Sequence, residues 1–312
     1  MASGRRLASL ALHLQQGGAT AAAAAAATAE QEDDAAAEAE VRFEVDGAVA
    51  SIVLSNERQR NPLKGRVLRR LLACIQEIAD RRFEIRVVLL RSEGPVFSSG
   101  HDFADFDLRA QPREHGESIL ALCAEVNVAL SRLPQPTIAV VQGLATAGGC
   151  QLACSCDLIV CSEKAFFRCP GSAGGGFCHT PGVSLAQKIH PRRALEMLLL
   201  ASPVPAKQAL EWGLVNRVFA HEELDAEAEK MAALLTKASA FNMQSGKESF
   251  YKIVEEADLE KKYALAGSYM SDYFYSYDGQ VCRQCTRRAR NSRSVLFCVR
   301  ETLKANPQIA ME

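Results

Sequence analysis

Three short runs of apolar residues constrain the fold of this chain more than any other feature. They read IRVVLLRS at 85–92, TIAVVQG at 137–143 and CDLIVCS at 156–162. β-Branched residues recur in these runs, and a run that is apolar at nearly every position is typical of a strand covered on both faces. Segments with helical spacing lie between and after the runs. Strands that alternate with helices indicate an α/β fold with a mostly parallel sheet.

The segments with helical spacing end at prolines or at polar residues. Apolar residues recur at helical intervals from Val67 to Ile78 and from Ile119 to Leu133, and Pro134 follows the second segment directly. After about Pro191 the pattern becomes mainly helical. The helices expected there cover Ala194 to Leu200, Ala206 to Trp212 and Glu222 to Ala238.

A hairpin is predicted where the ordered part of the chain begins. VRFEVDGAVASIVLS at 41–55 alternates in polarity on both sides of Asp46-Gly47, a dipeptide that favours a tight turn. Order is therefore expected from about Val41. We divide the chain that follows into an α/β core over 41–190, a helical region over 191–280 and a basic tail over 281–312.

The first forty residues have the composition of a disordered, low-complexity arm. Seven alanines fill positions 21–27, and six acidic residues follow between Glu30 and Glu40. Arg5 and Arg6 precede several leucines with no acidic residue before Glu30, which is compatible with a mitochondrial presequence. Two interpretations stay open. The segment is a mitochondrial transit peptide, or it is an arm without a targeting signal on a cytoplasmic protein.

Charge and hydropathy exclude two classes of partner. The 36 Lys and Arg residues balance 37 Asp and Glu residues, so the net charge is −1 and no basic field favours nucleic acid. No run of about 18 apolar residues predicts a membrane span. The basic tail is interpreted as a solvated segment, with an RNA-binding arm as the distant alternative.

The eleven cysteines are interpreted as small buried thiols. Cys150, Cys154, Cys156 and Cys161 lie close together without the spacing of zinc ligands. Cys282 and Cys285 form a single C-x-x-C, which is weak support for metal or redox chemistry. No metal is predicted.

Two glycine-containing turns are the candidate site. GPVFSSGHDF at 94–103 follows one apolar run, and Ala147-Gly148-Gly149 lies between a second run and a helix-like segment. A helix that starts at Gly148 or Gly149 would expose free N–H groups. One N–H from each turn could bracket a carbonyl oxygen and form an oxyanion hole. Neither turn matches a P-loop or the G-x-G-x-x-G fingerprint.

Several motifs in register resemble the crotonase (enoyl-CoA hydratase/isomerase) superfamily. They are FSSGHDF, VQGLATAGGCQLACSCDL and TPGVSLAQKI, with RNPL at 60–63 before them and ALEMLLLASPVPAKQALEWGLVNRVF at 194–219 after them. The resemblance covers about Val41 to Gln280. It implies a crotonase ββα superhelix followed by a C-terminal helical region, and packing as a homotrimer or hexamer through residues 191–280.

The resemblance also implies a ligand and its contacts. The backbone N–H groups of His101 and Gly148 would polarise the thioester carbonyl of an acyl-CoA. The segment with Ser98, Ser99, His101 and Asp102 would approach the coenzyme A moiety, although Asp102 itself is expected to cap a turn. No separate cofactor is implied, because coenzyme A is part of the substrate.

The chain departs from the family where hydratases carry two catalytic glutamates. Gln151 and Gly171 stand at those positions, and neither side chain can exchange a proton near neutral pH. His179 is a candidate base in a motif loop. A loop histidine with no catalytic role is an equally good interpretation. A thiol nucleophile at Cys169 or Cys178, beside His179, is conceivable, with buried packing as the default.

These departures leave two functions open. One is an enzyme of fatty acid metabolism that uses the oxyanion hole for isomerisation, decarboxylation or thioester hydrolysis rather than hydration. The other is a non-catalytic acyl-CoA binder that regulates lipid metabolism. The family resemblance stops at Gln280, so the tail raises the hypothesis of an alternative C-terminal end.

Overall fold

The computed structural model of the chain describes residue 31, residues 33–281 and residue 283. Most of the predicted N-terminal arm and nearly all of the predicted basic tail, including Cys282 and Cys285, lie outside the described residues. No helix in the described part is both long and apolar enough to cross a membrane.

The core contains a six-stranded sheet in the order β1-β2-β4-β7-β9-β12. The β1–β2 pair is antiparallel, and every other neighbouring pair is parallel. Its strands are β1 (Val41–Asp46), β2 (Val49–Leu54), β4 (Val87–Ser92), β7 (Thr137–Val141), β9 (Leu158–Ser162) and β12 (Arg217–Phe219). The three apolar runs are thus neighbouring central strands, as the α/β prediction requires.

Two smaller sheets lie beside the first one. The four-stranded sheet has the order β11-β10-β8-β5, and β3 pairs with β6. Their strands are β5 (Val96–Ser98), β8 (Leu144–Thr146), β10 (Phe166–Arg168), β11 (Val204–Pro205), β3 (Pro62–Leu63) and β6 (Gly100–His101). Three strands of the large sheet each lead directly into a strand of the four-stranded sheet, and this repeat confirms the ββα superhelix.

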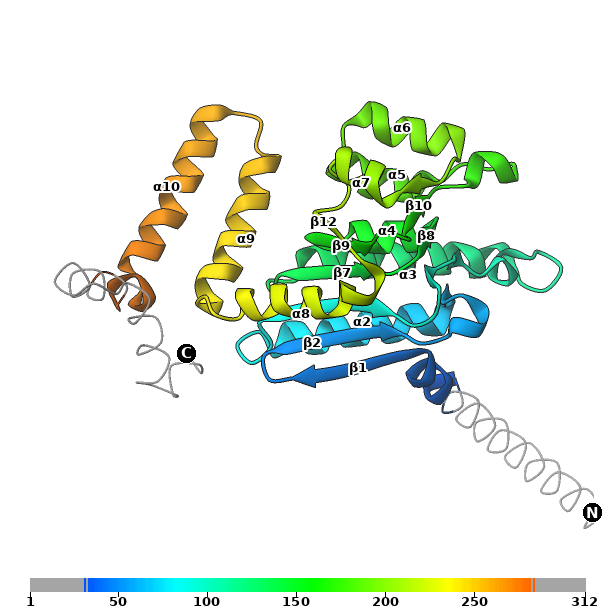
Figure 1. Ribbon diagram of the computed structural model, residues 1–312, viewed down its shortest axis with the longest axis horizontal. Helices are drawn as coiled ribbons and strands as arrows, with labels where there is room; N and C mark the ends of the chain where they lie inside the picture. Colours follow the sequence, from blue (N-terminus) through cyan, green and yellow to red (C-terminus); the bar gives the residue numbers. More distant parts are fainter. Residues whose placement is uncertain (1–30, 32, 282, 284–312) are drawn as a thin grey trace, which may run out of the picture.

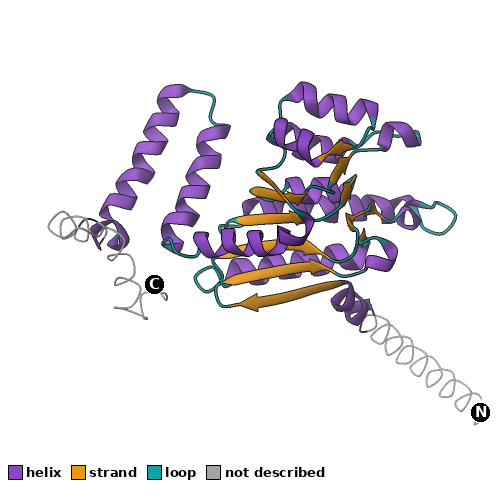
Figure 2. Cartoon of the chain, in the orientation of Figure 1, coloured by secondary structure: helices purple, strands orange, loops and turns teal. Residues whose placement is uncertain are grey.

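Helices cover both faces of the large sheet (Figure 2). They are α2 (Gly65–Asp80), α3 (Arg113–Arg132), α4 (Gly148–Cys154), α5 (His179–Lys188), α6 (Pro191–Leu200), α7 (Ala206–Glu211), α8 (Leu224–Leu235), α9 (Ala240–Glu255) and α10 (Leu259–Tyr275). Short 3-10 turns are η1 (Glu57–Gln59), η2 (Phe103–Phe106), η3 (Gly171–Gly174) and η4 (His221–Glu223).

Alternate residues of the central strands face two separate cores. Val88 and Leu90 of β4 belong to the cluster that includes residues of α2 and α3. Val87 and Leu89 belong to a smaller cluster with α8. A strand buried on both faces needs apolar residues at every position, which explains the continuous apolar runs.

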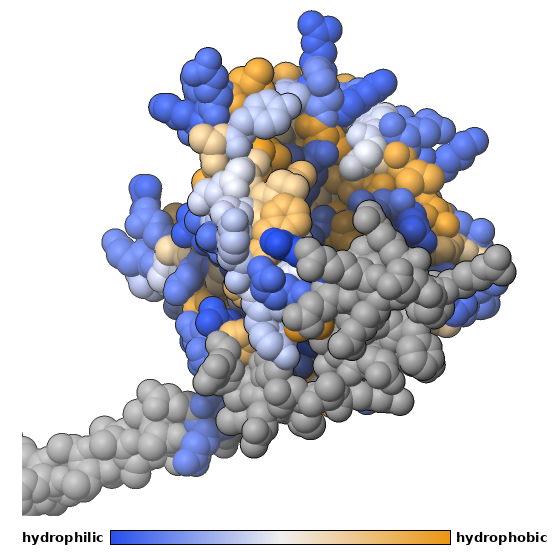
Figure 3. Space-filling model, turned by 90° about the vertical axis from the view of Figure 1, so that its left-hand side faces the viewer, coloured by the Kyte–Doolittle hydropathy of each residue, from blue (hydrophilic) through white to orange (hydrophobic). Residues whose placement is uncertain are grey.

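Helices α9 and α10 form an antiparallel hairpin beside the core, drawn in yellow and orange in Figure 1. Gln244 is the one buried residue in α9, and α10 has none. Large apolar side chains are exposed along both helices, including Phe241, Phe250, Val254, Leu259, Tyr263, Met270, Phe274 and Tyr275. Figure 3 views the molecule from this side and shows apolar surface exposed between polar side chains.

Two predicted boundaries are wrong. Order begins before Val41, because residues 33–40 are helical and Ala37 is buried. Ion pairs from Glu40 to Arg66 and from Asp33 to Arg69 hold this segment against α2. Helix α3 starts at Arg113 rather than near Ile119, because its first turn is exposed and polar and so carries no apolar spacing.

Candidate functional site

The two predicted turns lie in direct contact. Gly100 is in the left-handed region with φ +83°, and a Cβ built on it would lie 2.9 Å from the backbone nitrogen of Gly148. A Cβ on Gly148 would lie 3.5 Å from the Gly100 Cα and 3.5 Å from Cδ2 of His101. The structure therefore brings His101 and Gly148 together from segments almost fifty residues apart.

Short strands and a strained residue set this geometry. Strand β6 pairs in parallel with β3, so His101 lies opposite Leu63. On the other side, Ala147 precedes α4 with φ 50° and ψ −120°, an unusual conformation for a residue with a side chain. Strain of this kind is often found at functional sites. It turns the chain so that α4 begins at Gly148.

The hydroxyl of Ser98 and the backbone N–H of Ser99 form hydrogen bonds within the protein. Ser98 is fully buried, and its hydroxyl donates to the carbonyl oxygen of Asn61 at 2.7 Å. The hydroxyl oxygen of Ser98 in turn accepts from the N–H of Gly100 at 3.2 Å. The N–H of Ser99 donates to the carbonyl oxygen of Arg60. These bonds join the turn at 98–100 to the segment before β3.

Asp102 is the N-cap of η2, and its carboxylate accepts from the N–H of Ala104 at 3.0 Å. This confirms the capping interpretation.

The side chain of His101 is partly buried, and both ring nitrogens are out of contact with solvent. Neither nitrogen has a hydrogen-bond partner of ordinary geometry, although the backbone of Leu63 interacts with the ring. The ring packs edge-on against Phe106, with centroids 5.7 Å apart. Burial lowers the pKa of His101, and the nearby Asp105 carboxylate opposes this shift only in part. The side chain is thus a neutral group with unused hydrogen-bonding capacity.

Gln151 supplies a second unpartnered polar atom. It lies one turn along α4 from Gly148, its side chain is buried, and its Oε1 has no hydrogen-bond partner. Buried polar atoms without partners are costly in a native protein and call for an explanation. His101 and Gln151 are the two members of the predicted site with this property.

Gly171 has room for no side chain. A Cβ on it would lie 2.7 Å from the backbone nitrogen of Cys178 and 2.8 Å from the carbonyl carbon of Phe177. The segment that follows Gly171 therefore packs into the space that a larger residue would need. The sequence analysis noted that Gly171 has no side chain, but it did not give the steric reason.

His179 is exposed at the start of α5. Its ring contacts Phe177, and its Nδ1 lies 3.0 Å from the carbonyl oxygen of the same residue. Within the described residues no hydrogen bond joins His179 to His101, Gly148 or Gln151. Cys169 and Cys178 are buried, as the default interpretation expects.

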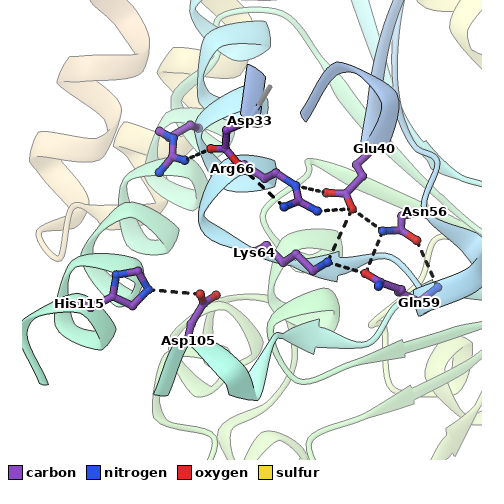
Figure 4. A network of polar contacts seen from close by, with 9 residues as sticks. Asp33, Glu40, Asn56, Gln59, Lys64, Arg66, Asp105 and His115 are labelled. Atoms are coloured by element: carbon purple, nitrogen blue, oxygen red, sulfur yellow. Dashed lines mark hydrogen bonds and ion pairs between the residues drawn. The ribbon is translucent and has the colours of Figure 1, made fainter. Parts of the chain in front are cut away.

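The sequence analysis missed a network of Lys64 and Arg66 with Glu40 and Asp33, which Figure 4 shows. Lys64 follows Leu63, the residue paired with His101, and its ammonium lies 3.7 Å from Glu40. Arg66 binds Glu40 at 2.7 Å, and this hydrogen bond, together with Asp33 and Asp102 nearby, raises its pKa. The signal was the basic segment KGRVLRR at 64–70.

A separate cavity of about 980 Å³ lies elsewhere on the core. Its lining includes Arg91, Gln142, Lys164, His221 and Asp225, and none of the predicted site residues takes part. Among the described residues, no cluster of histidine, cysteine and acidic side chains could hold a metal ion.

Comparison with known proteins identifies a family that matches most of the chain. Residues 44–285 match the family described as enoyl-CoA hydratase/isomerase. The mouse (Mus musculus) protein called enoyl-CoA hydratase domain-containing protein 3, mitochondrial, is 40% identical over 232 residues, which are 74% of this chain and 76% of the mouse protein.

Solved structures agree with this result. The crystal structure of human enoyl coenzyme A hydratase domain-containing protein 3 superposes with a TM-score of 0.77 at 36% identity, covering 80% of this chain and 97% of the human one. An enoyl-CoA hydratase from Mycobacterium smegmatis superposes with a TM-score of 0.76 at 35% identity, covering 80% and 96%.

Proposed function

Because the chain belongs to the enoyl-CoA hydratase/isomerase family, we propose that it binds an acyl-CoA and polarises the thioester carbonyl with the N–H groups of His101 and Gly148. The observation that carries this proposal is the close contact between the two turns. A Cβ built on Gly100 would lie only 2.9 Å from the backbone nitrogen of Gly148. Two donors fixed by backbone structure need no reorganisation when charge develops on the carbonyl oxygen.

The unpartnered polar atoms support a ligand beside these turns. The ring nitrogens of His101 and the Oε1 of Gln151 gain partners when a polar ligand enters. Since burial keeps His101 neutral, it offers one donor and one acceptor and adds no charge to the site.

Hydration of an enoyl-CoA is disfavoured by the same residues. Hydration needs a group that takes a proton from water and a group that gives one to the substrate. The Gln151 amide does neither near neutral pH, and Gly171 has no side chain. If the protein turns over its ligand, isomerisation, decarboxylation or thioester hydrolysis fits the site, because each builds charge on the carbonyl oxygen.

The second candidate function is a non-catalytic acyl-CoA binder that regulates lipid metabolism. It is favoured by Gln151 and Gly171 at the two expected glutamate positions, because neither can transfer a proton near neutral pH. Both candidates share the same binding step.

Calorimetric titration with octanoyl-CoA, and with free coenzyme A as control, tests that step. Stronger binding of the thioester than of free coenzyme A is expected, because free coenzyme A lacks the thioester carbonyl that the two N–H groups would polarise. Equal affinities, or no binding of either, would overturn the proposal. Release of free thiol or loss of enoyl absorbance over a panel of acyl-CoAs then separates an enzyme from a binder.

We further propose that the protein is a homotrimer or hexamer. The α9–α10 hairpin exposes a row of large apolar residues that a monomer would leave in water. Light scattering of the full chain should give three or six times its 33.8 kDa mass, and a monomer at micromolar concentration would contradict this.

A mitochondrial location is proposed from the basic N-terminal residues and from the names of the relatives. Fluorescence microscopy of the full chain against that of a chain lacking residues 1–30 tests it.

A further inference from the structure

Four buried thiols meet beside the candidate site. Cys150 and Cys154 lie on α4, Cys169 directly follows β10, and Cys178 directly precedes α5. The side chain of Cys150 interacts with those of Cys154 and Cys169, and Cys169 interacts with Cys178. The thioester chemistry proposed above uses none of them.

These thiols do not form a metal site, because no group of described residues is arranged to hold an ion. Two adjacent thiols can together lose two electrons and form a disulfide bond.

The pair Cys169 and Cys178 is better placed for this than the others. The eight residues between them include Gly171 and the run Gly174–Gly176. A Cβ on Gly174 or Gly175 would touch nothing within 4 Å, so the middle of this segment does not pack against the core. Cys150 and Cys154, in contrast, are fixed one turn apart on a single helix.

Access and hydrogen bonding favour the same pair. Cys178 is 8% exposed, whereas Cys150, Cys154 and Cys169 are at most 1% exposed. The N–H of Gly171 donates to the sulfur of Cys178 at 3.2 Å. Hydrogen bonding with the neighbouring thiols of Cys150 and Cys178 lowers the pKa of Cys169, and its burial opposes this shift.

We propose that Cys169 and Cys178 are an oxidative modification site, where a peroxide converts the two thiols into a disulfide that closes residues 169–178 into a ring. One sulfur attacks the peroxide O–O bond and becomes a sulfenic acid, with release of one water. The other sulfur attacks the sulfenic acid, forms the S–S bond and releases a second water. The two thiols lose two electrons and two protons, and hydrogen peroxide is reduced to two waters.

The ring lies next to the thioester site, since Cys150 contacts Cys169 and is two residues from Gly148. The disulfide fixes the glycine-rich wall formed by residues 170–177. On the basis of the proposed function, we expect this to change the affinity for acyl-CoA several-fold.

Peptide mapping of the full-length protein tests the modification site directly. Trypsin cleaves after Arg168 and Lys188, so one peptide carries both cysteines. After brief treatment with equimolar hydrogen peroxide and alkylation, this peptide should lack both alkyl groups and weigh two hydrogens less than the reduced peptide, and dithiothreitol should reverse the change. Cys178→Ser should abolish the product, whereas Cys161→Ser, on β9, should retain it.

Three results would overturn the proposal: two alkylated cysteines in the peroxide-treated peptide, a cross-link from Cys169 to the peptide that contains Cys150, or irreversible sulfonic acid as the first product. The peptide map of the wild-type protein decides whether the modification site exists, even if the Cys178→Ser variant fails to fold. Titration of the reduced and oxidised protein with octanoyl-CoA tests the coupling, and equal affinities would refute it. If neither form binds acyl-CoA, the proposed function fails while the map still decides the modification site.

Discussion

At Gly171 the surrounding backbone leaves no space for a side chain. The Cβ direction of this residue points at the backbone of Phe177 and Cys178, at distances under 3 Å. A larger residue at this position would first require the segment at 171–178 to move. The packing of this segment therefore requires glycine at position 171.

Gly171→Ala should lower the free energy of unfolding by about 1–3 kcal/mol, the usual cost of overpacking. Urea denaturation measures this. Gly174→Ala, in the same 3-10 turn, is the matched control, because its Cβ meets nothing within 4 Å and the change should be within about 1 kcal/mol of wild type. Equal stabilities for the two variants would contradict the steric account.

The lowered pKa of His101 leads us to expect that the stability of the protein depends on pH. Burial lowers its pKa in the folded state below the ordinary value of 6.5, so the unfolded chain takes up a proton first as the pH falls. The contribution of His101 is complete above about pH 6.5 and is lost as the pH falls toward the pKa of the folded state.

Urea denaturation at pH 7.5 and pH 5.5 should therefore show a larger loss of stability for wild type than for His101→Gln. An equal loss in both proteins would mean that the imidazole of His101 is not held in its neutral form.

At the scale of elements, the contact between α9 and the core depends on a buried polar cluster. Lys247 of α9 lies 2.7 Å from Asp157 and donates to the carbonyl oxygen of Gln135 at 3.0 Å. Tyr251, one turn further on, donates to Asp157 at 2.8 Å, and Thr137 of β7 also donates to this carboxylate. Burial lowers the pKa of Lys247, and Asp157 opposes the shift. The hairpin is thus held by charge and hydrogen bonds while its apolar residues stay exposed.

Asp157→Asn should destabilise the protein by about 3–5 kcal/mol, because it leaves Lys247 buried without its carboxylate. The double variant Asp157→Asn with Lys247→Met removes both charges and should recover much of the loss. Urea denaturation measures both effects. A double variant as unstable as the single one would show that the ion pair is not the cause.

The elements also show how far the sequence predicts the fold. The strands at 87–92, 137–141 and 158–162 were predictable because each faces two cores and carries apolar residues at every position. The helix over residues 33–40 was not predictable, because salt bridges to Arg66 and Arg69 hold it rather than an apolar face of its own. Acidic residues of the segment whose composition suggested disorder, Asp33 and Glu40, form ion pairs with α2.

At the scale of the whole molecule, the site depends on segments distant in sequence. Motif resemblance selected His101 and Gly148, but only the folded chain shows Gly100 in contact with Gly148. The sequence could not reveal that Ser98 is used internally, or that Lys64 and Arg66 form ion pairs with Glu40, because both facts depend on contacts between distant segments. Helix α10 has no buried residue, and its large apolar side chains are exposed.

The central claim is that two backbone N–H groups bind one thioester oxygen, and infrared spectroscopy of a carbonyl-labelled acyl-CoA measures this bond directly. Gly148→Pro deletes the donor at the first position of α4. Gly148→Ala keeps the donor, with its Cβ 3.3 Å from Leu63. We predict that the carbonyl stretch shifts to lower frequency on binding to wild type and to Gly148→Ala, and that much of this shift is lost in a folded Gly148→Pro protein. A bound carbonyl with the same frequency as in water, or a shift unchanged in Gly148→Pro, would contradict the account.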